Sequence, residues 1–219
     1  MRVNKDTILL GMFLSLILVA VNLAQDSPPS IPNTREADLI ELISLDSSFK
    51  LDVRYAREDN FVGKIVYPEA RVFLQRPAAE AALRVHKKLS LLGYGLMLFD
   101  GYRPRSVTKL FWEITPEDKR MFVANPKNGS KHNRGCAVDL TIYDLKTGRP
   151  LPMPSDYDEF TERASPNYEG GSEEERRNRN LLRTLMEEEG FIVNANEWWH
   201  FDFKDWEKYD IYDIPFDQL

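Results

Sequence analysis

The chain has 219 residues, of which 42% are hydrophobic and 29% charged, as is typical of one globular domain with a short additional segment. Its formal net charge of −6 argues against the basic surface that binding to nucleic-acid phosphates requires. The single cysteine, Cys136, has no partner within the chain for a disulfide. The sequence therefore predicts a protein stabilised by its core or by a metal ion, without a nucleic-acid partner.

The amino-terminal residues have the pattern of an export signal. Two basic residues precede an uncharged apolar run from Ile8 to Ala24, which predicts a signal peptide over residues 1–24. Because this run is just long enough to span a bilayer as a helix, an uncleaved amino-terminal anchor is the alternative. Residues 25–34, rich in proline and serine, are expected to be a flexible linker, and residues 35–219 the folded domain. We expect that domain to be exported, to the periplasm or the cell surface.

The first half of the domain has three segments with clear patterns. The alternation of residues in Phe49–Ala56 predicts a strand. A helix is predicted next, with Pro77 in its first turn, apolar residues at helical spacing and Gly93 at its end. Leu96–Phe99 is then expected to form a short buried strand that runs into a turn.

The second half contains a strand, a long loop and a helix. Cys136–Tyr143 alternates as a strand, and residues 144–171 are rich in proline, acidic residues and turn formers. Loops of this length in compact domains tend to be functional or mobile. Ser172 and Glu175 form a capping-box pattern for a helix that is expected to end at Gly190.

The last patterned segment is Asn196–Phe203, whose aromatic residues favour a strand. The predicted strands and helices do not alternate as βαβ units. We therefore expect a single α+β domain with a mainly antiparallel sheet and flanking helices.

Asp139 is the first candidate for chemistry, because it lies inside a predicted strand. A buried carboxylate without a partner is costly, so it is expected to protonate, pair with a cation or bind a metal. Strand alternation puts Asp139 on the more polar face, beside the small Ala137. His132 precedes this strand, and Gly135 between them tolerates the bend that would return His132 toward Asp139.

His200 is the third candidate metal ligand. Glu197 precedes it by three residues, an offset that puts the two side chains on opposite faces of a regular strand. We therefore expect Glu197 to lie in a turn or bulge before the strand. Two histidines and one carboxylate, with a fourth position left to water, form a catalytic zinc set rather than a structural one.

These residues also have simpler interpretations. Asp139 could pair with an arginine such as Arg134, and Glu197 could be an ordinary surface carboxylate. His86, at the edge of the predicted helix, is interpreted as a core or surface residue. The alternation turns Cys136 away from the metal candidates, and we interpret it as a small buried residue.

Several motifs resemble those of the D-alanyl-D-alanine dipeptidases, zinc peptidases related to the D,D-carboxypeptidases. "SKHNRGCAVDL" (Ser130–Leu140) resembles their Ser-x-His-x-x-x-x-x-x-Asp motif, and "EWWHF" (Glu197–Phe201) resembles their Glu-x-x-His motif. "DGYRP" (Asp100–Pro104) is similar to their arginine turn, and "DVRYAREDNFVGK" to a further family segment. Together the motifs cover the chain from about Asp52 to Phe203.

The resemblance implies roles for five residues. His132, Asp139 and His200 correspond to the ligands of one zinc ion, Glu197 to the catalytic base, and Arg103 to the residue that stabilises the transition state. This chain has a cysteine in the first motif where a serine or alanine is expected, which affects sensitivity to oxidation more than chemistry.

The resemblance also implies substrate contacts by Ser130, Tyr55 and Asp158, with Asp158 near the ammonium group of the dipeptide. Asp156, two residues earlier in the same loop, is the alternative to Asp158. The implied activity is zinc-dependent hydrolysis of the dipeptide D-alanyl-D-alanine in cell-wall metabolism. The alternatives are a D,D-carboxypeptidase that acts on peptidoglycan stem peptides and a non-catalytic, Hedgehog-like zinc-binding module. The residues do not indicate an oligomeric state.

Overall fold

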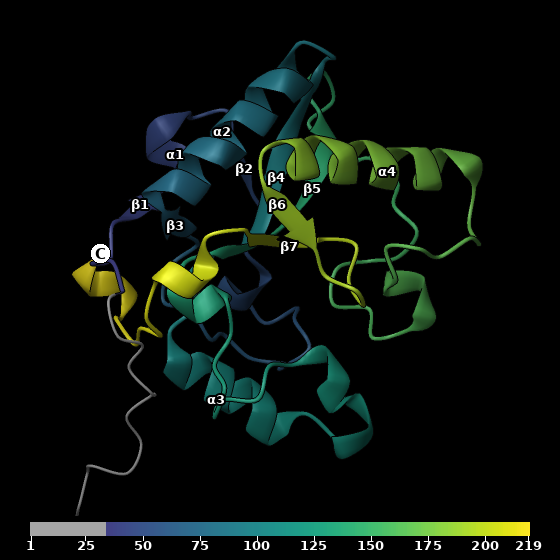
Figure 1. Cartoon of the computed structure of the whole chain (residues 1–219). Coiled ribbons are helices and arrows are strands. Elements are labelled where there is room, and N and C mark those ends of the chain that lie inside the picture. The colour runs from purple at the N-terminus through teal and green to yellow at the C-terminus, as the bar shows by residue number, and fades with distance from the viewer. Residues whose placement is uncertain (1–33) are drawn as a thin grey trace, which may run out of the picture.

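A computed structural model describes residues 34–219 (Figure 1). The signal peptide predicted for residues 1–24 lies outside the described residues, as does the predicted linker except for its last residue. Within residues 34–219, no helix combines the length and the apolar character needed to cross a bilayer.

The elements of the described part follow one another without βαβ alternation. In chain order they are β1 (Leu39–Glu41), α1 (Leu42–Leu45), β2 (Lys50–Leu51), η2 (Arg54–Ala56), β3 (Phe73–Gln75), α2 (Arg76–Ser90), β4 (Tyr94–Asp100), α3 (Arg105–Ile114), η3 (Glu117–Phe122), η4 (His132–Arg134), β5 (Ala137–Asp144), η5 (Glu162–Ala164), α4 (Glu173–Glu188), β6 (Phe191–Val193), β7 (His200–Phe203), η6 (Trp206–Lys208) and η7 (Phe216–Gln218), where η marks a 3-10 helix.

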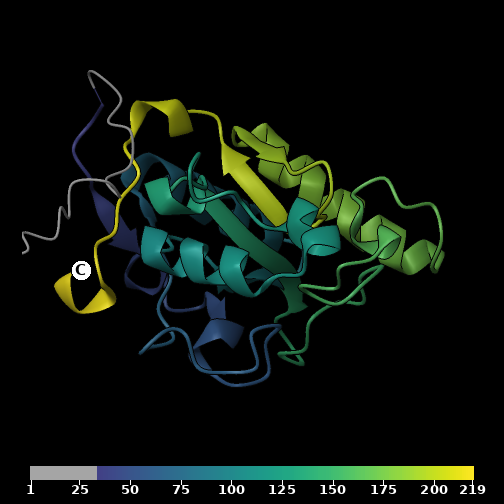
Figure 2. The same ribbon diagram turned by 90° about the horizontal axis from the view of Figure 1, so that it is seen from below.

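A five-stranded sheet with the order β2-β4-β5-β7-β6 forms the centre of the domain. Its pairs are antiparallel except for β2 with β4, and β1 and β3 form a separate antiparallel pair. Helices α2 and α4 lie on one side of the sheet, and α3 lies on the other (Figures 1 and 2). The predicted α+β class with a mainly antiparallel sheet is confirmed.

Local sequence signals explain the two long helices. Pro77 is in the first turn of α2, where its missing N–H has no intrahelical partner to lose. The small and apolar residues of this helix are buried toward the sheet. At the start of α4, the Ser172 hydroxyl accepts the Glu175 N–H at 3.2 Å, and the Glu175 carboxylate accepts the Ser172 N–H at 2.6 Å. The predicted capping box is therefore present.

Two regions differ from the pattern-based expectation. The strand predicted over Phe49–Ala56 is confined to Lys50–Leu51, because the chain turns into η2 and buries the ring of Tyr55 against Phe111 of α3. Helix α3 itself was not predicted, although Val107, Leu110, Phe111 and Ile114 have helical spacing in the sequence. This helix covers the face of the sheet on which the site lies.

His86 and Cys136 are buried residues outside the site, as interpreted from the sequence. The His86 ring accepts the Leu96 N–H on Nδ1 at 3.0 Å, and its Nε2 lies 2.8 Å from the Ser48 hydroxyl. Burial lowers the pKa of His86. The Cys136 thiol is fully buried, and burial raises its pKa to about 12.

Candidate metal centre

Strand pairing places three polar residues of the site in one row. Asp100 at the end of β4 is opposite Asp139 in β5, which is opposite His200 at the start of β7. A register shift between Leu98 and Asp100 adjusts the end of β4. Residues paired across antiparallel strands have neighbouring side chains on the same face. The sheet therefore holds the Asp139 carboxylate beside the His200 ring.

His132 reaches these residues through a tight turn. It begins the 3-10 helix η4, which ends at Gly135 in the left-handed conformation with φ 65°. A Cβ atom at Gly135 would lie 2.4 Å from a methyl carbon of Leu39, so this position suits glycine for two reasons. The turn also packs on the Asp100–Pro104 segment, since the Arg103 N–H donates to the His132 carbonyl at 3.1 Å. The bend expected from the sequence is present.

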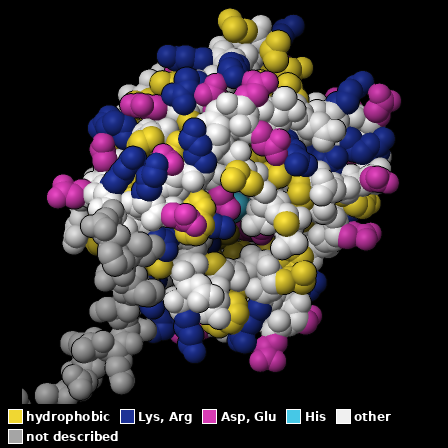
Figure 3. Space-filling view, in the orientation of Figure 1, with side chains coloured by type: hydrophobic (Ala, Val, Ile, Leu, Met, Phe, Trp, Pro, Cys, Tyr) yellow, Lys and Arg dark blue, Asp and Glu magenta, His cyan; other side chains and the backbone are white. Residues whose placement is uncertain are grey.

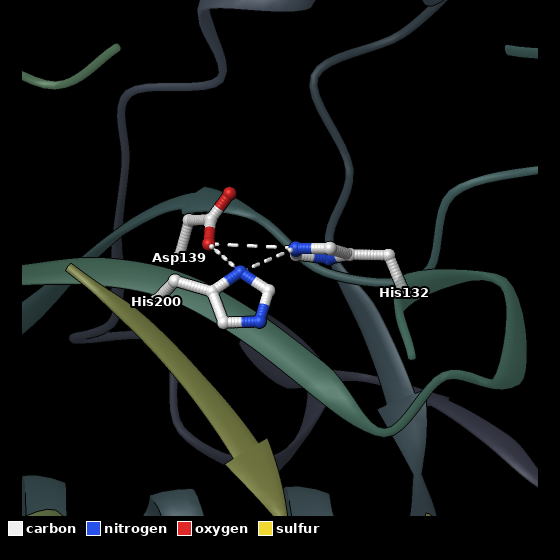
Figure 4. Close-up of side chains that lie close together, drawn as sticks. All are labelled: His132, Asp139 and His200. Carbon is white, nitrogen blue, oxygen red and sulfur yellow. Dashed lines mark hydrogen bonds and ion pairs between the residues drawn. The ribbon is translucent and has the colours of Figure 1, made fainter. Parts of the chain in front are cut away.

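The three side chains converge on one point (Figure 4). His132 Nε2 lies 3.1 Å from His200 Nδ1, and Asp139 Oδ1 lies 3.4 Å from the former and 3.0 Å from the latter. All three residues are buried. Ligand atoms around a tetrahedral zinc ion are about 3.3–3.6 Å apart, given metal–ligand distances of 2.0–2.2 Å. The observed spacing is close to this value.

The other polar atom of each side chain has a protein partner. His132 Nδ1 lies 2.7 Å from a backbone carbonyl oxygen, and His200 Nε2 lies 2.9 Å from an oxygen of Asp202. The Tyr157 hydroxyl donates to Asp139 Oδ2 at 3.1 Å. A neutral histidine carries one proton, which these acceptors hold on the outer nitrogen. The lone pairs of the inner nitrogens therefore face Asp139.

The environment of the inner oxygen of Asp139 shows whether the site fits a metal ion. Oδ1 is buried and accepts no hydrogen bond in the described part of the chain. Burial alone would raise the pKa of Asp139, but the two histidines hold it well below its usual range. Burial opposes charge on His200, yet Asp202 and Asp139 raise its pKa well above the ordinary value. A pocket that favours positive charge between two inward-facing nitrogens and an orphaned carboxylate oxygen fits a divalent metal ion.

Arg134, the alternative partner for Asp139, points elsewhere: its guanidinium donates to the backbone carbonyl of Tyr209. Arg103 is nearer to the site, with NH2 3.8 Å from Asp139 Oδ2. Asp100 fixes the Arg103 side chain by accepting from Nε at 2.9 Å and from NH2 at 2.7 Å. This leaves a buried cation beside the converging ligands rather than among them.

Glu197 lies at the edge of the candidate metal position. It precedes β7 in a turn, as expected, and its Oε2 is 3.8 Å from His200 Nδ1. Burial raises the pKa of Glu197 to about 7. A metal cation bound nearby would lower this pKa, so the carboxylate can act as a base near neutral pH.

A cavity of about 230 Å³ opens in front of the three ligands. Figure 3 shows a hollow at the centre of this face, with histidine and acidic atoms at its edge. Arg103, Glu197, Ser130 and Asp158 line it. Drug-sized ligands occupy pockets of about 300–1,000 Å³, so this cavity suits a smaller ligand.

The predicted substrate contacts differ in position. Asp158 reaches the cavity from the long loop in a backbone conformation that is rare outside glycine, with φ 59°. Tyr55 is not among the residues that line the cavity; it lies behind Asp158 and donates to its Oδ2 at 2.9 Å. Asp156, the alternative to Asp158, is exposed and outside the cavity lining. Among the acidic residues of this loop, the geometry thus favours Asp158.

Three residues that support the site were not singled out from the sequence. Asp100 orients Arg103, Tyr157 contacts Asp139, and Asp202 contacts His200. Asp202 follows His200 by two residues, so strand periodicity alone would have put the two on one face. Tyr157 lies in an irregular loop, where no periodicity predicts its direction.

Residues 35–217 match the profile of the D-Ala-D-Ala dipeptidase family. The chain belongs to this family. Its members are metallopeptidases, which agrees with the three converging ligands.

Relatives within the family cover most of the chain. A D-alanyl-D-alanine dipeptidase of Escherichia coli is 33% identical over 165 residues, which are 75% of this chain and 84% of the relative. One from Enterococcus faecium is 37% identical over 172 residues, which are 70% of this chain and 85% of the relative. One from Streptomyces coelicolor is 34% identical over 188 residues, or 77% and 93%.

Two solved structures overlap with the chain more loosely. The D,D-dipeptidase VanXYg, solved with a D-Ala-D-Ala phosphinate analogue, is 19% identical, covers 78% of this chain and 68% of its own, and has a TM-score of 0.42. The LD-carboxypeptidase LdcB is also 19% identical, and the match covers 80% of this chain and 73% of LdcB, with a TM-score of 0.42.

Metal binding should depend on the converging histidines. One equivalent of metal is expected to raise the melting temperature by roughly 5–11 °C at about 100 times Kd, since only the native state holds the site together. His132→Ala and His200→Ala should remove this shift, which metal analysis and thermal unfolding will measure. His86→Gln, which alters a buried histidine outside the site, should keep it. A full equivalent of metal retained by the variant with both His132→Ala and His200→Ala would contradict the assignment of these ligands.

Proposed function

We propose that this chain is an exported zinc dipeptidase that hydrolyses D-alanyl-D-alanine released in cell-wall metabolism. The observation that carries the proposal is the small cavity itself. Three converging ligands, a carboxylate of raised pKa, a fixed guanidinium and a loop carboxylate surround it. The membership of the D-Ala-D-Ala dipeptidase family supports the same activity.

Zinc is the metal that suits the donor set best. Two imidazole nitrogens and one carboxylate, with a position left open, are typical of catalytic zinc sites. His132, His200 and Asp139 would hold the ion. When bound, it would supply a Lewis acid that acidifies water and polarises a peptide carbonyl.

Glu197 is proposed as the base that moves the proton. Its carboxylate lies beside the ligands without belonging to the group of three, so it can accept a proton from the attacking water. The same carboxyl group can then donate this proton to the amine that leaves when the C–N bond breaks.

Arg103 is proposed to stabilise the charge that develops on the carbonyl oxygen. Asp100 holds the guanidinium in place through two hydrogen bonds, and the Phe111 ring lies 4.8 Å beneath it. Because the donor is already oriented, little reorganisation is needed when the negative charge forms.

Asp158 is proposed to recognise the free ammonium group of the dipeptide. Tyr55 orients its carboxylate, which lines the cavity together with Ser130. Burial raises the pKa of Asp158 well above its usual range, so its charged form needs a cation such as this ammonium group. A longer peptide has a neutral amide at this position, which would not stabilise that charge. The site would thereby select a dipeptide over a stem peptide.

Catalysis and metal binding should separate in two variants. Glu197→Gln is expected to keep its zinc and to lose about 10²–10⁴-fold in kcat, because the base is removed while the three ligands remain. Arg103→Lys should lose about 10²–10³-fold, because lysine cannot reproduce the fixed guanidinium. Steady-state kinetics with metal analysis test both, and Glu187→Gln on the exposed face of α4 serves as the control. An active Glu197→Gln enzyme would rule out the proposed base.

The preference for a free dipeptide over acetylated or longer substrates should depend on Asp158. N-acetyl-D-alanyl-D-alanine and the stem pentapeptide are expected to be cleaved about 10²- to 10³-fold more slowly than D-alanyl-D-alanine. Asp158→Asn should narrow this difference mainly by slowing the dipeptide, whereas Asp156→Asn, an exposed neighbour, should not. Equal kcat/KM values for the free and the acetylated dipeptide would contradict the dipeptidase proposal and favour the alternative, a D,D-carboxypeptidase.

Export is proposed from the amino-terminal sequence. If residues 1–24 are removed as a signal peptide, protein from the native host should begin near Gln25 and be released when the cell envelope is disrupted. Amino-terminal sequencing decides this. Intact Met1 in a membrane fraction would favour an anchor, and intact Met1 in the cytosol would contradict export.

A further inference from the structure

An ion pair between a buried aspartate and a partly exposed lysine lies behind the metal ligands. Asp202 follows His200 by two residues in β7, and its Oδ1 lies 2.9 Å from His200 Nε2. Its other oxygen, Oδ2, lies 3.0 Å from Lys131 Nζ. Lys131 directly precedes His132. The pair therefore joins the segments that carry the two histidines.

The pair is built into the fold rather than adventitious on the surface. Asp202 is 8% exposed and is paired with Ala137 of β5 in the sheet register. The ammonium group of Lys131 lies 5.3 Å from the centre of the Trp206 ring. Both ends of the pair are thus held, one by the sheet and one by an aromatic contact.

We propose that Asp202 and Lys131 are positioning residues that set the affinity of the site for zinc, an inference that rests on the metal site proposed above. By accepting from His200 Nε2, Asp202 keeps the ring proton on the outer nitrogen and the Nδ1 lone pair toward the ion. A carboxylate partner also makes the imidazole a stronger donor. Lys131 holds this carboxylate in line with the ring and offsets its buried charge.

Asp202 is not itself a fourth ligand in this arrangement. It contacts Nε2, whereas Nδ1 of the same ring faces His132 and Asp139. The two nitrogens are on different sides of the imidazole, so the ring separates Asp202 from the converging atoms. Neither Asp202 nor Lys131 is a fixed position of the two motifs that carry the family resemblance.

The experiment measures zinc affinity rather than turnover. Chelator competition should give a zinc Kd that is about 10- to 100-fold weaker for Asp202→Ala than for the unsubstituted protein. Asp202→Asn, which keeps an acceptor oxygen in a side chain of similar size, should lose less zinc affinity than Asp202→Ala. Lys131→Met should also lose less zinc affinity than Asp202→Ala. Asp205→Asn, which disrupts a more exposed lysine pair on the same segment, is the matched control and should not change Kd.

A second readout separates positioning from general loss of structure. In the zinc-loaded protein, the His200 Nε2–H should give a slowly exchanging proton resonance that is lost in Asp202→Ala. Thermal unfolding of the metal-free variants shows whether they fold. A folded Asp202→Ala variant whose zinc Kd and His200 resonance match those of the unsubstituted protein would overturn the inference.

The two proposals fail in different ways. If the metal site is wrong, the unsubstituted protein and His200→Ala will bind zinc equally poorly. If only the positioning role is wrong, the unsubstituted protein will bind one zinc ion, His200→Ala will lose it, and both Asp202 variants will bind as tightly as the unsubstituted protein.

Discussion

The buried carboxylate of Asp139 is the constraint on which the site depends. One of its oxygens accepts from Tyr157, while the other is buried, has no hydrogen-bond partner within residues 34–219 and faces two histidine nitrogens. An uncompensated carboxylate in this environment costs several kcal/mol. The fold keeps it in place through the central strands of the sheet and the tight turn at Gly135. A bound cation would offset this cost and link the two histidine segments, so stability and function share one interaction.

Different structural elements hold the residues with different proposed roles around this centre. The sheet presents Asp139 and His200, the Asp100 turn presents Arg103, and the long loop between β5 and α4 presents Asp158. Rigid strands thus carry the metal ligands, where small errors in position would be most costly. The loop carries the group proposed to recognise the substrate ammonium, where variation between relatives would change specificity without changing the reaction.

The sequence predicted those parts of the fold in which local signals agree with tertiary packing. The capping box of α4 and the helical spacing of α2 gave the correct elements, because each helix buries the face that its pattern marks as apolar. The strand predicted from Phe49 was too long, since its alternation continues into residues that pack on α3 instead of pairing. For the site, the motifs indicated His132, Asp139 and His200 together. They did not indicate that Tyr55 supports Asp158 from behind, because that contact depends on how the long loop packs on η2 in three dimensions. The contact of Asp202 with His200 was missed although the spacing of two residues in a strand would have placed both on one face.

The central claim is that these three side chains hold one metal ion and that Glu197 does not. A crystal structure of the zinc-loaded protein, with anomalous scattering recorded on both sides of the zinc absorption edge, tests it most directly. The account predicts one strong peak about 2.0–2.2 Å from His132 Nε2, His200 Nδ1 and Asp139 Oδ1, with the Glu197 carboxylate outside the coordination shell. A peak bound by Glu197 or Asp202 instead, or the absence of any peak between the two histidines, would contradict it.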